Sequence, residues 1–125
     1  MREAVRFAVS AVMSAGLRLA LGTPGSYGIP QTTSQMLLNL LEFGMNIQQA
    51  IEAPRFRCLA GRKVEMEDRF PEEVRRQLEL KGHEVQLVEG WSRSVGGAQG
   101  ILVDLESGSF SGGADPRRDG YAMGW

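Results

Sequence analysis

A glycine-rich segment early in the chain most constrains how it can fold. Leu17 to Leu21 alternates apolar and other residues, which predicts a short strand that ends at Gly22. Between Gly22 and Gly28 three glycines permit positive φ and Pro24 fixes its own φ, so the backbone should turn sharply and present its N–H groups. Pro30 then suits the first position of a helix, where a missing N–H costs nothing. A strand, a sharp turn and a helix are therefore predicted in succession.

Two helices are expected directly after this turn. Between Pro30 and Gly44, apolar residues recur at helical spacing, at Met36, Leu37, Leu40 and Leu41. Asn46 and Gln49 have the spacing of a capping box, which starts a second helix that Pro54 ends. Helices so close in the sequence are expected to pack as a pair.

The second half of the chain predicts one more helix and several strands. Pro71 opens the helix, with Glu72 and Glu73 in its first turn, where the helix dipole favours negative charge, and Gly82 ends it. Short strands are expected at residues 63–66, 84–87, 99–103 and 109–111, the last two joined by a hairpin turn at residues 106–108.

These elements together predict one α+β domain, with helices packed on mainly antiparallel strands. No internal repeat or low-complexity linker divides the 125 residues. Roughly four or five short strands with no evident closure would leave sheet edges unpaired unless another chain covers them.

Charge and composition exclude several classes of function. The 14 basic residues nearly cancel the 15 acidic ones, and no cluster of Lys and Arg is long enough to follow a phosphate backbone, which argues against a nucleic-acid partner. Cys58 and His83 are the only residues of their kinds, so neither an intrachain disulfide nor a Cys-based zinc site can form, and His83 is expected in a solvent-facing turn. No residue cluster implies a cofactor.

The first 16 residues are atypical. Arg2 and Arg6 precede an apolar run from Phe7 to Ala15, an arrangement similar to a signal peptide but too short to span a bilayer. A strand or short helix packed on the core, or an irregular start, is the favoured alternative, and the cellular compartment stays open.

Taken alone, the turn at residues 22–28 followed by a helix is a general device for binding anions through backbone N–H groups. It lacks the Gly-Lys-Ser/Thr of a Walker loop and the spacing of a dinucleotide-binding turn. A plain connection between a strand and a helix is therefore the alternative.

A series of motifs gives the turn a context. In its order and spacing the series resembles the second half of the γ-glutamyltransferase small subunit, over residues 17–125, with residues 1–16 outside the resemblance. The motifs are Gly22-Thr23-Pro24-Gly25, Pro30-Gln31-Thr32, Glu42-Phe43-Gly44-Met45-Asn46, Gln49-Ala50-Ile51, Ala53-Pro54-Arg55-Phe56 and Gly113-Ala114-Asp115-Pro116-Arg117.

The resemblance implies an N-terminal nucleophile hydrolase, a four-layer αββα sandwich of which this chain would form a part. Such enzymes transfer or hydrolyse the γ-glutamyl group of glutathione and related amides through an ester on an N-terminal threonine. In the family the positions of Gly25 and Ser26 provide the backbone N–H groups of the oxyanion hole. Many relatives have glycine where Ser26 stands, but serine keeps the N–H if its φ is permitted.

Other family features are expected outside this chain. The catalytic threonine precedes the glycine turn by tens of residues, and Thr23, Thr32 and Thr33 lie within the turn or the predicted helix. Ser10 and Ser14 do not match the family's substrate-binding serine pair. The expected partners are therefore a missing large subunit and nucleophile segment, with a γ-glutamyl small molecule bound by the complete enzyme.

Two alternatives remain at this point: a non-catalytic remnant that self-associates or binds a partner, and a small anion-binding protein. Asp115 and Arg117 are expected to tie the C-terminal turn to the core, with contact to a ligand as the alternative. Arg55 is expected to form a buried or half-buried ion pair that organises the fold, with no direct catalytic part.

Overall fold

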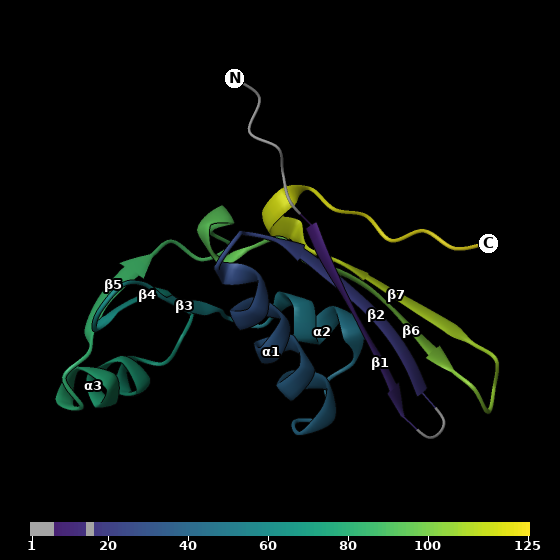
Figure 1. Ribbon diagram of the computed structural model, residues 1–125, viewed down its shortest axis with the longest axis horizontal. Coiled ribbons are helices and arrows are strands. Elements are labelled where there is room, and N and C mark those ends of the chain that lie inside the picture. Colours follow the sequence, from purple (N-terminus) through teal and green to yellow (C-terminus); the bar gives the residue numbers. More distant parts are fainter. Residues whose placement is uncertain (1–6, 15–16) are drawn as a thin grey trace.

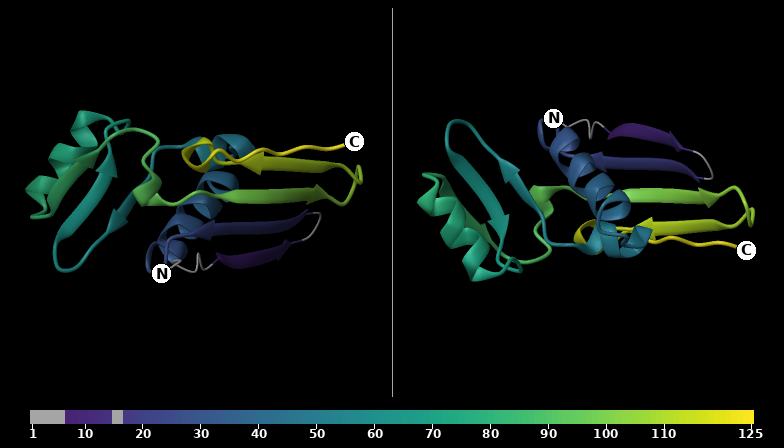
Figure 2. Two further views of the ribbon diagram at one scale, coloured as in Figure 1. Left: turned by 90° about the horizontal axis from the view of Figure 1, so that it is seen from above. Right: turned by 90° about the horizontal axis from the view of Figure 1, so that it is seen from below.

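The computed structural model describes residues 7–14 and 17–125, and in them two sheets lie side by side (Figures 1 and 2). The larger sheet has the strand order β1 (Phe7–Ser14), β2 (Leu17–Pro24), β6 (Gln99–Asp104) and β7 (Phe110–Ala114), and all its pairs are antiparallel. The smaller sheet has the order β3 (Phe56–Cys58), β4 (Lys63–Glu67) and β5 (Glu84–Val88). The α+β prediction is confirmed.

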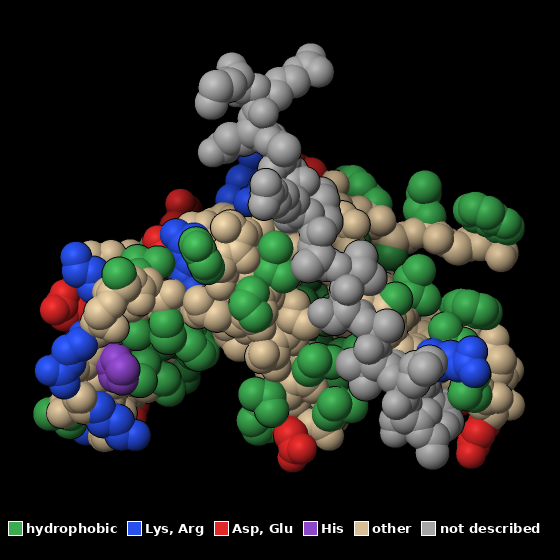
Figure 3. Space-filling view, in the orientation of Figure 1, with side chains coloured by type: hydrophobic (Ala, Val, Ile, Leu, Met, Phe, Trp, Pro, Cys, Tyr) green, Lys and Arg blue, Asp and Glu red, His purple; other side chains and the backbone are tan. Residues whose placement is uncertain are grey.

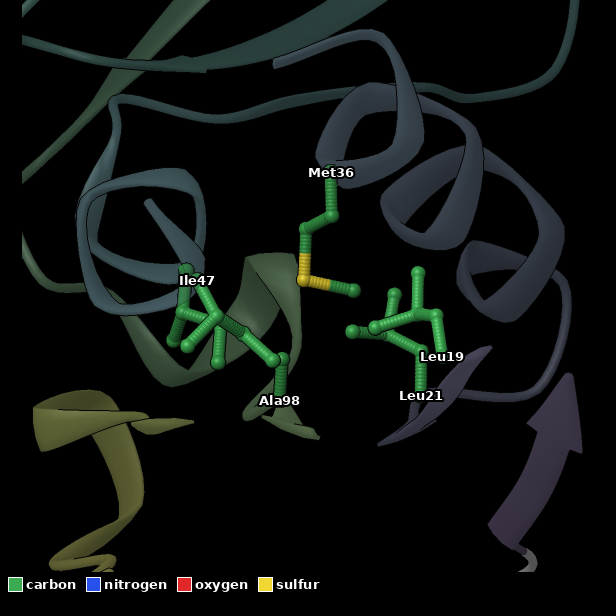
Figure 4. Close-up of a cluster of buried hydrophobic side chains, with 6 residues drawn as sticks. Leu19, Leu21, Met36, Ile47 and Ala98 are labelled. Atoms are coloured by element: carbon green, nitrogen blue, oxygen red, sulfur yellow. The ribbon is translucent and has the colours of Figure 1, made fainter. Parts of the chain in front are cut away.

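Helices α1 (Gly28–Leu41) and α2 (Ile47–Glu52) cover one face of the larger sheet, and the C-terminal tail runs over the other face (Figure 2). A hydrophobic core fills the space between the helices and the sheet, formed by Leu19, Leu21, Met36, Ile47, Ile51 and Ala98 (Figure 4). Burial of each large aliphatic side chain stabilises this layer by about 1.5–3 kcal/mol. In β7, Gly113 lets α2 come close, because a Cβ there would lie 2.8 Å from the Cδ1 atom of Ile51.

The smaller sheet is built differently. Its β4 and β5 are parallel and joined through α3 (Glu72–Leu80), whereas β3 and β4 are antiparallel. No residue of α3 is buried. Val64 and Met66 of β4 are the buried apolar residues in its strands.

Several local predictions are confirmed. The capping box of α2 forms in both directions, since the Asn46 side chain accepts from the Gln49 amide and the Gln49 side chain accepts from the Asn46 amide. Gly44 has a φ of 63° just after α1, and His83 is exposed. The expected helix from Pro71 and the hairpin of β6 and β7 are also present.

Other predictions needed correction. Strand β2 does not end at Gly22 but continues to Pro24, because antiparallel pairing with β1 extends to that residue. Helix α1 begins at Gly28, so Pro30 is its third residue. Residues 56–58, where the sequence predicts no strand, form β3, which pairs with β4.

The N-terminal segment is described only in part. Its residues 7–14 form β1, in agreement with the strand alternative, and residues 1–6 and 15–16 lie outside the described part. The domain boundary at residue 17 stays a prediction. Within residues 7–14 and 17–125, no helix has the length and apolar character needed to cross a membrane.

Candidate functional site

The turn between β2 and α1 is held in a strained conformation. Gly25 has a φ of 139°, which favours glycine, and Ser26 has a φ of 52°, in the left-handed region. Their carbonyls begin the helix: the Gly28 amide donates to the Gly25 oxygen at 2.8 Å and the Ile29 amide donates to the Ser26 oxygen at 3.0 Å. The residues predicted as oxyanion donors therefore lie directly before the N-terminus of α1.

The bond to the Gly25 carbonyl determines where the Ser26 amide points. In a trans peptide, the C=O and the N–H that follows it point in opposite directions. Because the Gly25 carbonyl points toward α1, the N–H of Ser26 points away from the helix. Within residues 7–14 and 17–125, neither the Gly25 nor the Ser26 amide donates a hydrogen bond to a protein acceptor. The turn can therefore present N–H groups to an anion at a helix N-terminus.

Buried threonines attach this turn to the segment that precedes β6. The Thr23 hydroxyl accepts from the Gly97 amide at 3.2 Å and donates to the Pro24 carbonyl at 3.2 Å. The Thr32 hydroxyl donates to the Val95 carbonyl at 3.2 Å. Both threonine side chains are buried, so these bonds are shielded from water.

A buried ionic cluster lies on the other side of the same segment. Arg55 binds Asp115 at 2.8 Å, and Arg117 binds Glu67 through two nitrogens at 2.7 and 2.8 Å and Asp115 at 3.1 Å. All four side chains are at most 2% exposed. The Val95 carbonyl also accepts from Arg55 at 3.4 Å, so the segment contacts both the cluster and the turn.

The cluster shifts the pKa values of three of its groups. Burial opposes ionisation of Glu67, but hydrogen bonds from Arg117, the Arg55 amide and Arg69 outweigh it and lower the pKa of Glu67 to about 2. Burial also opposes the charge of Arg117, but its bonds to Glu67 and the nearby Asp115 raise its pKa. Burial lowers the pKa of Arg55 despite its partner Asp115.

Arg69 connects the cluster to the surface. Arg69 donates to Glu67 at 2.9 Å, and its guanidinium carbon lies 3.8 Å from the centre of the Trp91 ring. Trp91 itself has a φ of 68° and is partly exposed. The aromatic ring thus covers the cluster from outside, a cation–π arrangement.

The structure places the predicted residues in two groups. Gly25 and Ser26 are adjacent in the exposed turn, and the expected ion-pair residues Arg55, Asp115 and Arg117 meet in the buried cluster. The sequence did not identify Glu67 as a member, and its only local signal was an acidic residue at the end of an apolar-alternating strand. Within the described part of the chain, no group of three or more His, Cys, Asp or Glu side chains could hold a metal ion.

Comparisons with known proteins agree with the family resemblance of the sequence. The family model for gamma-glutamyltranspeptidase matches residues 8–125, so the match begins inside β1. The chain is 38% identical over 114 residues to the glutathione hydrolase-like YwrD proenzyme of Bacillus subtilis (strain 168), covering 86% of this chain and 21% of that protein. It spans about a fifth of the length of the curated relatives that it matches.

Solved structures agree with the fold. The Bacillus anthracis transpeptidase CapD superposes with a TM-score of 0.83 at 24% identity, over 99% of this chain and 74% of that chain. A cephalosporin acylase from Bacillus halodurans superposes with a TM-score of 0.80 at 34% identity, over 85% of this chain and 20% of that chain.

Proposed function

Because this chain belongs to the γ-glutamyltranspeptidase family, we propose that it forms the oxyanion-binding part of an enzyme that hydrolyses or transfers the acyl group of an amide. The γ-glutamyl group of a glutathione-type amide is the proposed acyl group. The observation that carries the proposal is the turn at Gly25 and Ser26, whose amides have no protein acceptor among the described residues and precede a helix N-terminus.

The chemistry follows from what such a turn does to a developing charge. When a nucleophile attacks an amide carbonyl, the oxygen becomes an oxyanion in the tetrahedral intermediate. N–H groups already aimed at that oxygen stabilise it more than the neutral carbonyl, and removal of one such donor typically costs about 2.7–4 kcal/mol of barrier. The α1 N-terminus adds a partial positive charge on the same side. The nucleophile and the binding groups for the γ-glutamyl end would come from other segments of the enzyme.

The relatives support this choice of reaction. One is described as glutathione hydrolase-like and another as a cephalosporin acylase, and both names refer to cleavage of an acyl group. Since the chain covers about a fifth of the curated relatives, we propose that activity requires a nucleophile segment and a large subunit in addition to these 125 residues.

The test uses a chromogenic γ-glutamyl anilide. The purified chain is assayed alone and together with the nucleophile segment and large subunit of a close relative, and release of the aniline is followed. Turnover only in the combined sample supports the proposal. Turnover by the chain alone would overturn the requirement for further segments, and no turnover in either sample would favour a non-catalytic role.

A matched pair of variants then tests the turn. Gly25→Ala adds a Cβ at a φ of 139° with its nearest neighbour 3.9 Å away, so it disturbs the backbone conformation and not the packing. Gly61→Ala does the same at a φ of 70°, in open space far along the chain. We expect Gly25→Ala to lower kcat by about 100-fold and Gly61→Ala to leave it within twofold. Equal kcat values in the two variants would exclude the turn as the oxyanion site.

A second candidate, a non-catalytic module that self-associates, is favoured by exposed apolar groups. Hydrophobic side chains protrude along the C-terminal tail and the β6–β7 end of the larger sheet (Figure 3). Phe110 is 75% exposed, and Tyr121, Met123 and Trp125 are more so. A cavity of about 490 Å³ lies between this tail and the sheet. Such patches mark interaction sites more often than free surface.

Light scattering after gel filtration tests this alternative. If the patch pairs two copies, Phe110→Ser should shift a dimer toward the monomer, whereas Leu80→Ser on the exposed face of α3 should not. A monomeric wild-type chain at high concentration would count against self-association.

A further inference from the structure

We propose that Thr23 is a positioning residue that orients the Gly25 N–H toward the substrate oxygen. The proposal rests on the proposed oxyanion role of the turn. Thr23 does not touch the substrate in this scheme; it acts through the peptide bond that joins Pro24 to Gly25.

The geometry of one peptide plane carries the argument. The Thr23 hydroxyl donates to the Pro24 carbonyl at 3.2 Å. That carbonyl belongs to the same planar trans peptide as the Gly25 N–H, which therefore points in the opposite direction. Rotation of this peptide plane would break the bond between Thr23 and the Pro24 carbonyl, and it would turn the Gly25 N–H away from its present direction at the same time. The hydroxyl thus restricts the orientation of the donor.

The hydroxyl is itself fixed from the other side. The Gly97 amide donates to the Thr23 oxygen at 3.2 Å, while the single hydroxyl hydrogen is donated to the Pro24 carbonyl. Thr23 is 0% exposed, and water does not compete for either bond. Gly96 keeps the approach close, because a Cβ there would lie 2.8 Å from the Thr23 hydroxyl oxygen.

The same chain of bonds strengthens the donor. Hydrogen bonds in series polarise one another, so a Pro24 carbonyl that accepts from Thr23 makes the Gly25 N–H a better donor. Among the described residues no corresponding side chain holds the peptide plane of the Ser26 N–H, which is fixed by the bond from the Gly28 amide to the Gly25 carbonyl. Loss of the Thr23 hydroxyl should therefore affect the Gly25 amide before the Ser26 amide.

The first test is nuclear magnetic resonance on the full chain, which needs no catalysis. Thr23→Val removes the hydroxyl at nearly constant shape, and Thr23→Ser keeps it. Thr33→Val is the control, since Thr33 is also buried but its hydroxyl has no hydrogen-bond partner among the described residues. We expect Thr23→Val alone to shift the Gly25 amide and to lower its order parameter from about 0.85 toward 0.6.

The second test is kinetic, in the combined enzyme. Thr23→Val should lower kcat by about tenfold or more with KM changed less than twofold, because a misplaced donor weakens binding of the transition state but not of the neutral amide. Thr23→Ser should restore most of the rate, and Thr33→Val should leave it unchanged.

The outcomes separate this proposal from the proposed function. If Thr23→Val lowers the melting temperature but leaves the Gly25 amide as Thr33→Val does, Thr23 has a structural role only and the proposal is wrong. If Thr23→Val does not fold, the χ1 angle of Thr23 is measured in the wild-type chain. A single χ1 rotamer supports the proposal, and averaging over several rotamers overturns it. If the combined enzyme is inactive, the proposed function fails while the resonance test still decides the role of Thr23.

Discussion

The two sheets of this chain achieve stability by different means. The larger sheet buries aliphatic side chains beneath α1 and α2, with Leu21, Met36 and Ile51 at most 1% exposed. The smaller sheet has a helix, α3, with no buried residue, and its parallel β4–β5 pair depends mainly on backbone hydrogen bonds and on Val64 and Met66. A hydrophobic half is thus joined to a half with little core of its own.

What joins them is the ionic cluster. Glu67 at the end of β4 belongs to the smaller sheet, and Asp115 and Arg117 follow β7 of the larger one. Because burying an ion pair costs desolvation energy, the cluster adds little net stability, and its main effect is geometric. A carboxylate and a guanidinium joined by several directed hydrogen bonds permit one arrangement of the two sheets. The comparison therefore predicts that the junction is more sensitive to substitution than either sheet.

Arg117→Met, at the junction of the two sheets, should reduce stability most. It leaves Glu67 and Asp115 buried with fewer counter-charges, and we expect the free energy of unfolding to fall by about 3–5 kcal/mol. The control is Arg76→Met, which removes the pair with Glu73 on α3, where both side chains are about 60% exposed. That variant should lose far less stability in urea denaturation, because water and salt screen an exposed pair. Equal losses would show that the junction has no special role.

Acid should have the next largest effect, because it protonates Glu67 and weakens the junction. The folded pKa of Glu67, about 2, lies below its ordinary value of 4.5, so its contribution is complete above pH 4.5 and is lost as the pH falls from there toward 2. The difference corresponds to about 3 kcal/mol. Urea denaturation between pH 6 and 2 measures it, with the Glu67 carboxyl carbon followed by resonance. In Glu67→Gln this part of the pH dependence should disappear, and a Glu67 carboxyl that titrates near 4.5 in the folded chain would contradict the assignment.

A smaller pair of substitutions compares the cores themselves. Ile51→Val removes one methylene from the fully buried side of α2 and should cost about 0.5–1.5 kcal/mol. Val74→Ala removes two methyl groups from α3, where Val74 is 40% exposed, and should change stability by less than about 0.5 kcal/mol. If the larger deletion on α3 proved the more costly, the smaller sheet would have a core that its burial does not indicate.

Much of this arrangement could be predicted from local signals. The α2 capping box depends on two residues three positions apart, and the turn at Gly25 depends on glycine's access to positive φ. Each can therefore be predicted from a few neighbouring residues. The three-residue strand β3 has no alternation long enough to recognise, and it exists because β4 pairs with it. Glu67 joins Arg117 across 50 residues, a pairing that only the tertiary fold creates.

The smallest expected effect comes from the same Ser→Gly substitution made at two positions, Ser26 in the turn and Ser34 in α1. At Ser26, with a φ of 52°, the Cβ disfavours the left-handed backbone, so Ser26→Gly should stabilise the chain by about 0.5 kcal/mol after the entropy cost of glycine is included. At Ser34, exposed in α1, the same change adds only that entropy cost, and we expect a loss of about 0.5 kcal/mol. Thermal unfolding of both variants measures the difference in sign. A destabilised Ser26→Gly would mean that the Ser26 side chain makes the turn more favourable than its backbone angle suggests, and that this residue is more than a substitute for glycine in the proposed oxyanion turn.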